Sequence, residues 1–388
     1  MGMNSIIKDA LQNARETKEQ DAIKKPGSAR ILVVGAGGAG NNTINRIMQI
    51  GIHGARCIAV NTDQQHLDVT NAHVKRLIGR NVTRGLGAGG FPRIGEAAAE
   101  ESREELAEIL SDADLVFVAA GMGGGTGTGS APVIADIAKK MGSIVVGVVT
   151  MPFNVERGRI IKAKQGLRKL RYYTDTVVVI DNNRLLDLVP NLPIEEAFSV
   201  ADEILANMVK GITECISIPS LINLDYADVR SILTDGGVAM VGIGEGEGEK
   251  RVEKAVKSAL DCPLLDVDIV GASGALIHVT GGSDLTLAEA TGVAELITDK
   301  MIDDANVIWG ARKDPRAEGM IRVILILTGV TSPQLLGPAD IMPDLPSIEP
   351  IRDYSKGTSI LRDNEPLYPV FSEDPKESDR DLGIPRLE

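Results

Sequence analysis

Gly121-Met-Gly-Gly-Gly-Thr-Gly-Thr-Gly129 is the stretch that says most about the fold of this chain. It follows an apolar run, residues 115–120, that has the pattern of a buried parallel strand. Residues 130–140 come next, with apolar residues at helical spacing and Pro132 near the expected first turn. The stretch therefore connects a strand to a helix N-terminus, where glycines bring backbone N–H groups together and threonines add hydroxyl donors. Such a loop suits a polyphosphate, and a glycine-rich turn that binds no ligand is the alternative.

Two common nucleotide-binding patterns are absent from the sequence. No Gly-x-x-x-x-Gly-Lys-Ser/Thr is present, so the lysine that neutralises phosphate charge in P-loop proteins is missing. The chain also lacks the Asn-Lys-x-Asp pattern with which Ras-like GTPases bind guanine. A nucleotide would therefore be held mainly by backbone dipoles, and its base would need a different pocket.

The composition is typical of layered α/β proteins. The chain has 388 residues, of which 43% are apolar, 3% are aromatic and 42 are glycine, so its core consists mostly of Val, Ile, Leu and Ala. That length is enough for two domains and a tail. The net charge of −13 disfavours broad binding to nucleic acid or to an anionic membrane.

Cysteine usage and hydropathy predict a cytoplasmic protein. Cys57, Cys215 and Cys262 are odd in number and far apart, which fits buried thiols in a reducing compartment better than disulfides or a zinc site. No apolar run is long enough for a transmembrane helix, so no direct membrane insertion is expected. Residues 1–30 are charged and lack the apolar core of a signal peptide.

Strand and helix patterns alternate from Arg30 onward, which predicts an α/β fold with a Rossmann-like parallel sheet. A long helix follows, and Pro219 ends it. The segments after it predict a smaller mixed α/β unit, and the last segment is rich in proline and charge. The expected parts are a flexible N-terminal arm (1–28), a nucleotide-binding domain (29–193), a connecting helix (194–218), a C-terminal α/β domain (219–330) and a disordered linker with a C-terminal peptide (331–388).

Two further glycine loops bear on the ligand. Gly35-Ala-Gly37-Gly-Ala-Gly40 follows the first strand and matches the Rossmann fingerprint, and Asp63 stands where a ribose-binding acid would stand. An NAD-dependent enzyme is therefore a rival hypothesis, although its hydride-transfer site would have to use His278, which lies in an apolar strand pattern. Gly85–Gly90 is the third such loop. A Rossmann domain needs one phosphate loop, so three loops suggest a triphosphate enclosed from several strand ends.

Polar residues that could bind a ribose and a base follow the later strands. Glu156 and Arg159 come just after Pro152-Phe153, and an acid there can bind ribose hydroxyls while an arginine binds phosphate or pairs with the acid. Asn182 follows the strand at 176–180, and Phe198 and Asp202 lie one turn apart on the long helix. An Asp that accepts from guanine N1–H and N2–H₂, beside an aromatic ring, would select guanine. A solvated helix start and ordinary core positions are the alternatives.

The segment Asn223-Leu-Asp225-Tyr-Ala-Asp228 places two carboxylates three residues apart, on one face of a helix that starts near Asp225. They would cap that helix, or they would orient and polarise a water molecule. Two carboxylates beside a triphosphate repel it unless a cation is present, so the second role implies Mg²⁺ or a monovalent cation.

Taken together, these motifs resemble FtsZ, the tubulin-like cytoskeletal GTPase family of prokaryotic cell division. The resemblance covers about residues 30–330 and is specific, because motifs on separate loops occur in the family's order. The matching motifs are Gly-Gly-Gly-Thr-Gly-Thr-Gly (123–129), Asn61-Thr-Asp63, Gly85–Gly90, Pro152-Phe153 and Asn223-x-Asp225-x-x-Asp228. The N-terminal arm is more similar to archaeal than to bacterial members.

The resemblance implies a set of residues that bind GTP or GDP. Many family members have four positions between the Glu and the Arg of the ribose site, whereas the step here is three, so Arg157 is a second candidate for the arginine. Phosphate contacts are implied for Gly38, Ala39, Gly40, Asn42, Gly125, Thr126 and Gly127, and ribose and phosphate contacts for Glu156 and Arg159. Guanine contacts are implied for Asn182, Phe198 and Asp202, and the wider nucleotide site includes Asn41, Asp63, Gly89, Gly90, Gly123, Gly124, Thr128 and Pro152.

The same resemblance implies a mechanism that requires assembly. The glycine loops supply no general base, and the acidic segment follows the long helix, roughly 30 Å away along its length. Asn223, Asp225 and Asp228 would therefore act on the GTP of the next subunit in a head-to-tail filament. The expected role is a polymer at the mid-cell division ring, joined to a membrane adaptor or division proteins through a C-terminal peptide that includes Ile384-Pro385. A tubulin-like relative that controls cell shape is the runner-up.

Overall fold

The structure is a computed structural model that describes residues 29–184, 193–217, 221–222, 225–261, 269, 271–302 and 304–330, without the side chains of residues 194, 195, 197 and 198. The predicted N-terminal arm, Asn223, Cys262 and everything from residue 331 onward lie outside these residues, as does Pro219.

Six parallel strands build the first half of the sheet, in the order β3-β2-β1-β4-β5-β6. The inner strands are short apolar runs buried on both faces, as a sheet covered by helices on both sides requires. The strands predicted at residues 115–120 and 176–180 are confirmed as β4 and β6, whereas β3, with two basic residues among four, was missed. The strands are β1 (Ile31–Ala36), β2 (Ala55–Asn61), β3 (Val74–Leu77), β4 (Leu115–Gly121), β5 (Ile144–Met151) and β6 (Thr176–Asp181).

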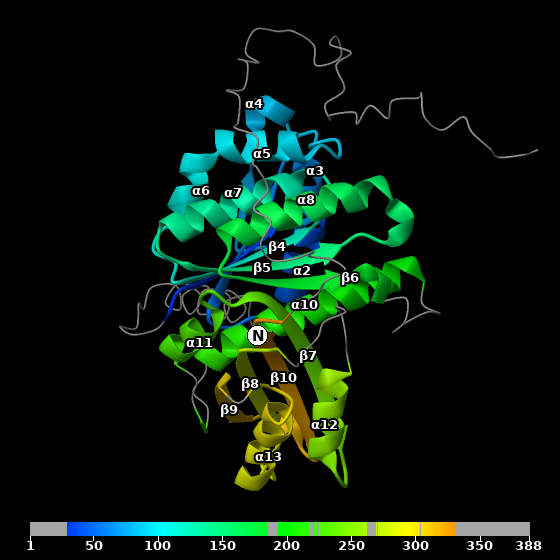
Figure 1. The fold of residues 1–388 in the computed structure, drawn as a ribbon. Coiled ribbons are helices and arrows are strands. Elements are labelled where there is room, and N and C mark those ends of the chain that lie inside the picture. The colour runs from blue at the N-terminus through cyan, green and yellow to red at the C-terminus, as the bar shows by residue number, and fades with distance from the viewer. Residues whose placement is uncertain are drawn as a thin grey trace, which may run out of the picture. The chain divides into compact units, whose positions relative to one another are not determined.

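Helices cover both faces of this half (Figure 1). One hydrophobic cluster joins the sheet to α5 (Pro92–Glu101), α6 (Arg103–Leu110), α7 (Thr126–Lys140) and α8 (Gly158–Tyr173). A second cluster joins the other face to α2 (Gly37–Ile50) and α10 (Ile194–Ser217). The predicted long helix is thereby confirmed as α10. Shorter elements are α3 (Gln64–Val69), α4 (Arg80–Thr83) and the 3₁₀ turn η1 (Asn154–Glu156).

Helix α7 begins earlier than its sequence suggests. The predicted start was near Ser130, but the helix starts at Thr126, inside the glycine run, and Pro132 lies within it. The early start is possible because α7 is buried almost all round, so tertiary packing outweighs the low helix propensity of glycine.

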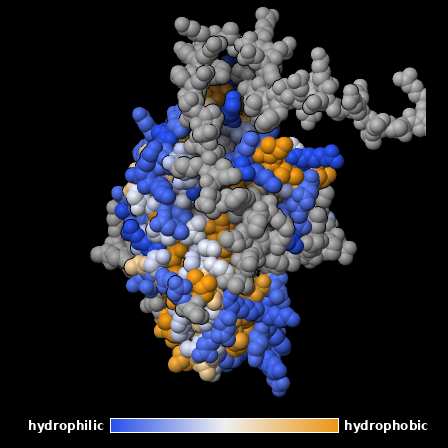
Figure 2. Space-filling model, viewed as in Figure 1, coloured by the Kyte–Doolittle hydropathy of each residue, from blue (hydrophilic) through white to orange (hydrophobic). Residues whose placement is uncertain are grey.

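The second half is a mixed sheet, as predicted. Its strands follow in the order β7-β10-β8-β9, in which β10 pairs antiparallel with both β7 and β8, and β8 pairs parallel with β9. The elements are β7 (Gly237–Glu247), β8 (Gly274–Gly281), β9 (Asn306–Lys313), β10 (Met320–Thr328), α11 (Tyr226–Leu233), α12 (Arg251–Leu260), α13 (Leu287–Thr298) and the turn η2 (Pro315–Ala317). The outward side of α12 is hydrophilic (Figure 2), while Ala255, Val256 and Ala259 face the core.

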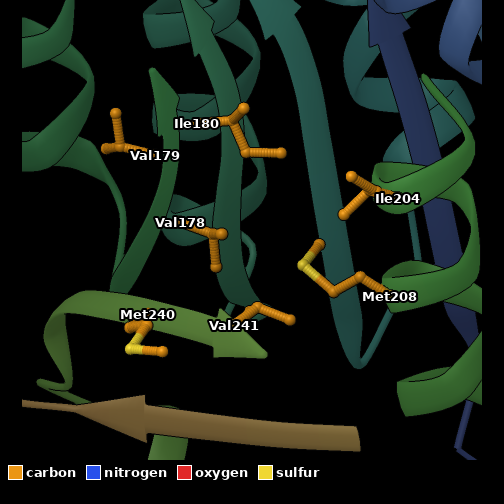
Figure 3. A pocket seen from close by; sticks show the side chains of 7 residues that line it. All are labelled: Val178, Val179, Ile180, Ile204, Met208, Met240 and Val241. Carbon is orange, nitrogen blue, oxygen red and sulfur yellow. The ribbon is translucent and has the colours of Figure 1, made fainter. Parts of the chain in front are cut away.

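The two halves share one continuous sheet, which the sequence did not predict. Strand β6 pairs with β7 in parallel, but only from Thr176 to Val178 opposite Gly237 to Ala239. Beyond these pairs the junction with α10 leaves a small cavity lined entirely by apolar side chains, including Ile204 and Met208 of α10 (Figure 3). This cavity offers no polar group to a nucleotide.

The two described thiols agree with the expectation from composition. Cys57 and Cys215 are free and buried, and burial raises the pKa of the Cys57 thiol to about 12. Within the described parts of the chain, no helix has the length and apolar character needed to cross a membrane.

Candidate functional site

Two glycine loops meet at the carboxyl edge of the parallel sheet. Strands β1 and β4 are neighbours; β1 leads directly into α2 at Gly37, and β4 leads through residues 122–125 into α7 at Thr126. The loops touch, since a Cβ added to Gly37 would lie only 2.6 Å from the backbone nitrogen of Gly127. Two helix N-termini with their unpaired N–H groups therefore converge at one place, which favours a polyanion.

The glycines of these loops fall into two groups. Gly125, Gly127 and Gly129 are packed against neighbouring backbone: a Cβ on Gly129 would lie 2.0 Å from the carbonyl oxygen of Pro92. Gly38 and Gly124 have open space where a Cβ would stand. The first group fixes the shape of the loop, and the second group leaves the backbone accessible to a ligand.

Threonine hydroxyls tie the loops together. The Oγ1 atoms of Thr62, just after β2, and Thr126 are 2.6 Å apart. The backbone N–H of Gly123 donates to Thr128 Oγ1 at 2.9 Å, and Thr128 is buried. Thr128 therefore shapes the loop, while Thr126 stays partly exposed at the ligand side. Sequence reasoning missed the role of Thr62, although its position directly after a strand signals it.

Two residues predicted to bind the nucleotide have structural partners in this chain. Asn41 is fully buried, and its amide lies within hydrogen-bond distance of the carbonyl oxygens of Gly35 and Val60. Asp63 caps α3 by accepting from the N–H of His66 at 3.1 Å, and it is only partly buried. Asn41 thus holds the first glycine loop against β2, and Asp63 places a partly exposed carboxylate at the carboxyl edge of the parallel sheet.

The third glycine loop is held by a lysine that the sequence analysis did not single out. Lys162 of α8 donates to the carbonyl oxygen of Gly90 at 2.8 Å, and its ammonium lies 5.4 Å from the centre of the Phe91 ring. Gly89 and Gly90 have positive φ values, so glycine is needed at both positions. The loop is consequently fixed to α8 with its exposed glycines at the same edge of the sheet.

The predicted ribose pair exists as an ion pair. Arg159 Nη1 donates to Glu156 Oε2 at 2.6 Å, and the backbone N–H of Phe153 donates to Glu156 Oε1 at 3.0 Å. The backbone of Arg159 packs against Gly123, which places the pair beside the second glycine loop. Arg157 has a φ of 27°, a strained conformation for a non-glycine residue, and is exposed. Pro152 is buried where β5 ends.

Two side chains expected to recognise a base have oxygens that can still accept a hydrogen bond. Asn182 is 7% exposed, and its Oδ1 has no hydrogen-bond partner within the described structure. Asp202 Oδ1 accepts from Thr43 Oγ1 at 3.0 Å, and burial raises the pKa of this carboxyl to about 6, although Thr43 and Arg46 oppose that shift. Phe198 lies one turn earlier on α10, and its side chain is outside the described residues.

The two acids of the second motif form the cap of α11. Asp225 Oδ1 accepts from the N–H of Asp228 at 2.8 Å, and Asp228 Oδ2 accepts from the N–H of Asp225 at 3.3 Å. This reciprocal capping box uses one oxygen of each carboxylate and fixes both side chains. Asp225 is exposed and Asp228 is partly so. Asn223 lies outside the described residues.

The acidic pair and the glycine loops lie at opposite ends of the same strand. Tyr226 of α11 donates to the carbonyl oxygen of Asp114, which immediately precedes β4, whereas the glycine run follows β4. Strand β4 has seven residues, which correspond to roughly 20 Å. The pair is therefore too far from the loops of its own chain to touch a phosphate bound there.

The residues that an NAD-dependent mechanism would need do not gather at this edge. His278 is buried in β8, paired with β9 and β10 in the other half of the sheet. Burial lowers the pKa of His278 to about 4, which keeps the imidazole neutral. His278 is therefore a core residue.

Both halves of the chain match models of known protein families. Residues 30–190 match the model "Tubulin/FtsZ family, GTPase domain", and residues 237–331 match "FtsZ family, C-terminal domain". The "Cell division protein FtsZ 2" of Methanocaldococcus jannaschii is 60% identical over 86% of this chain and 88% of its own length. That of Halobacterium salinarum is 55% identical over 87% of each. A solved structure, an empty FtsZ dimer of M. jannaschii, matches with a TM-score of 0.76 and 53% identity, over 81% of this chain and 92% of the other.

Proposed function

The chain belongs to the Tubulin/FtsZ family and is a GTPase, and from this premise we propose that it polymerises head to tail into protofilaments that form a cell-division ring. The observation that carries the proposal is the position of Asp225 and Asp228, at the opposite end of β4 from the glycine loops. A site that needs both parts is complete only when two subunits stack along the strand direction. The solved dimer of the M. jannaschii relative supports such self-association.

In the proposed site, the chain that binds GTP supplies the phosphate cradle. Backbone N–H groups around Gly38, Gly124 and Thr126 hold the phosphates, aided by the dipoles of α2 and α7. Arg159 and Glu156 form an ion pair and bind at the ribose side, and the backbone of Arg159 lies beside Gly123 of the loop. These groups orient the triphosphate and stabilise its charge, but they include no group that activates water.

The neighbouring chain supplies that missing group. Its Asp225 and Asp228 are fixed by their capping box, so their remaining oxygens face outward in a defined orientation. A water held between these oxygens and the γ-phosphate is polarised for attack. Hydrolysis then weakens the contact that GTP had bridged, and the filament disassembles more readily.

We include Mg²⁺, and a monovalent cation as its alternative, in the proposed site. No group of three His, Cys, Asp or Glu side chains that could hold a metal exists in the described ranges. The carboxylates of Asp225 and Asp228 of the neighbouring chain are oxygen ligands of the kind that Mg²⁺ prefers, and they would hold the ion together with the phosphates. The ion would supply positive charge between those carboxylates and the phosphates.

Guanine recognition is proposed for Asn182, Phe198 and Asp202. The unpartnered Oδ1 of Asn182 is a buried acceptor that a base N–H would satisfy. The Asp202 carboxylate, oriented by Thr43, accepts from guanine N1–H and N2–H₂. Adenine presents an acceptor at N1 and would leave this carboxylate unpaired, so GTP is preferred over ATP.

GTP affinity is expected to fall at acidic pH because the base needs the ionised form of Asp202. The pKa of this carboxyl is about 6 in the folded chain, so the dissociation constant should rise about tenfold per pH unit below that value. The sign is opposite for the fold itself: the pKa is raised on folding, so ionising Asp202 as pH rises through 6 removes stability. Titrating a fluorescent GTP analogue at pH 5, 6 and 7 measures the effect.

The control for this titration is Asp202→Asn, which cannot ionise. Its affinity should be weaker at pH 7 and nearly constant down to pH 5. A pH profile identical to that of the unaltered chain would remove Asp202 from the base pocket.

The proposed assembly is tested by GTP turnover per subunit as a function of protein concentration, with light scattering read in parallel. We expect a rate near zero below a threshold concentration and a rise together with scattering above it. A per-subunit rate that is constant at all concentrations would mean a self-contained site and would contradict the proposal.

The cellular role follows from the relatives. Both are named cell division proteins and match most of this chain. We propose that the chain acts at the mid-cell ring in the cytoplasm, and that residues 331–388, which lie outside the described structure, connect it to a membrane adaptor or to division proteins through the peptide around Ile384-Pro385.

Deleting residues 381–388 should leave assembly in solution intact and abolish recruitment to the ring.

A further inference from the structure

The tyrosine between the two acids of α11 makes a contact that the proposed mechanism has not used. Tyr226 Oη donates to the carbonyl oxygen of Asp114 at 2.8 Å, across the gap between α11 and the first half of the sheet. Partial burial raises the pKa of this phenol, so the hydroxyl stays protonated and remains a donor. A phenylalanine would fill the same space without this bond.

Asp114 is a well-anchored point of the sheet. Its backbone N–H donates to the carbonyl oxygen of Arg30 at 2.9 Å, and its Oδ2 accepts from the N–H of Arg30 at 2.7 Å. Its carbonyl oxygen also accepts from the N–H of Ile144 at 2.9 Å. Asp114 thereby joins the amino ends of β1, β4 and β5, and Tyr226 is bound to a residue that is held by hydrogen bonds to two other segments.

The other described side-chain hydrogen bonds that join α11 to the sheet lie later in the helix. Asn306, at the start of β9, donates to Ser231 Oγ at 3.3 Å, and Thr176 Oγ1 donates to the carbonyl oxygen of Leu233 at 2.6 Å. Helix α11 packs against β5 on one side and against β8 and β9 on the other (Figure 1). Within the described part of the first turn of α11, Tyr226 is the residue whose side chain donates a hydrogen bond to the nucleotide-binding half of the sheet.

We propose that Tyr226 is a positioning residue for GTP hydrolysis, which fixes the orientation of Asp225 and Asp228 toward the nucleotide of the next subunit. The proposal rests on the proposed function, because it assigns these two acids to the neighbour's GTP. The capping box locks the acids to the first turn of α11, and the Tyr226 hydroxyl locks that turn to Asp114. Without the hydrogen bond from Tyr226, the first turn of α11 rotates about the buried side of the helix, and the two carboxylates no longer point toward the nucleotide of the next subunit.

The test is Tyr226→Phe, which removes one oxygen atom. GTP turnover per polymerised subunit at saturating GTP should fall about 3- to 10-fold, the range expected for losing one hydrogen bond that holds a reacting geometry. GTP affinity, the concentration threshold for assembly and the melting temperature should stay close to those of the unaltered chain. Sedimentation gives the polymerised fraction, so turnover is normalised to filaments and not to total protein.

Two matched variants separate positioning from general loosening. Tyr172→Phe removes the same atom from an exposed tyrosine of α8, and it should change nothing. Asn306→Ala removes the contact between β9 and Ser231 of α11 instead, and it should leave turnover within twofold. If Asn306→Ala lowers turnover as much as Tyr226→Phe does, the specific role of Tyr226 is wrong.

Other outcomes distinguish a wrong role for Tyr226 from a wrong proposed function. Unchanged turnover in Tyr226→Phe, with turnover lost in Asp228→Ala, overturns the inference and leaves the proposed function standing. Loss of turnover that merely follows a lower melting temperature or a smaller polymerised fraction overturns it as well, because a structural role explains that result. Full turnover in Asp228→Ala overturns the proposed function itself.

Discussion

Asp228→Ala is expected to lower GTP turnover by about 100-fold or more, the usual effect of removing a group that activates water. GTP binding and assembly should persist, because Asp228 lies at the opposite end of β4 from the glycine loops of its own chain. The measurements are GTP affinity of the monomer, light scattering with GTP, and phosphate release per polymerised subunit. Filaments of this variant should also last longer after GTP is added.

The control is Asp228→Asn, which keeps an oxygen that can accept from the N–H of Asp225 and so preserves the capping box. If capping were the whole role of Asp228, the asparagine variant would keep its turnover while the alanine variant lost it. Loss in both variants supports the catalytic role. Loss of GTP binding by the monomer would place Asp228 in its own chain's pocket and contradict a site shared between subunits.

Gly37→Ala is expected to destabilise the fold and to weaken GTP binding together. Gly37 has a φ of +72°, and an added Cβ would lie 2.6 Å from the backbone nitrogen of Gly127. The left-handed conformation and the overpacking together cost about 2–5 kcal/mol. The clash also moves the first glycine loop away from the second, so affinity for GTP should fall about tenfold or more. Chemical unfolding and nucleotide titration measure the two effects.

Gly271→Ala is the matched control, since the same methyl group there meets open space and no positive φ is involved. It should change stability by less than about 0.5 kcal/mol and leave GTP affinity unaltered. A Gly37→Ala variant as stable and as tight in binding as this control would show that the contact between the two loops is dispensable.

The fold was largely predictable because buried parallel strands have a strong sequence signal. The run at residues 115–120 is apolar throughout, and the structure confirms it as β4. The family, the fold class and the GTPase activity are confirmed as well. Strand β3 was missed because Lys75 and Arg76 interrupt its apolar pattern. The start of α7 at Thr126 depends on packing between distant segments, which no local pattern contains.

The members of the candidate site stay predictions, and the structure adds packing detail that the sequence could not provide. The glycine motif predicts a phosphate loop, yet only the structure distinguishes Gly124, which faces open space, from Gly129, which packs against Pro92. Contacts between residues far apart in the sequence also escaped prediction: Lys162 with Gly90, and Tyr226 with Asp114. Each joins a helix to a loop through one polar atom, and such pairs leave no periodic trace in a sequence.

The placement of α11 and the glycine loops at opposite ends of β4 has a consequence for filament length. In the head-to-tail filament that we propose, the nucleotide of one terminal subunit faces solvent and has no neighbouring acidic pair. Such a filament has one fewer hydrolysing site than it has subunits. We therefore expect short oligomers to turn over less GTP per subunit than long filaments do, and one end to retain its triphosphate longer than the interior.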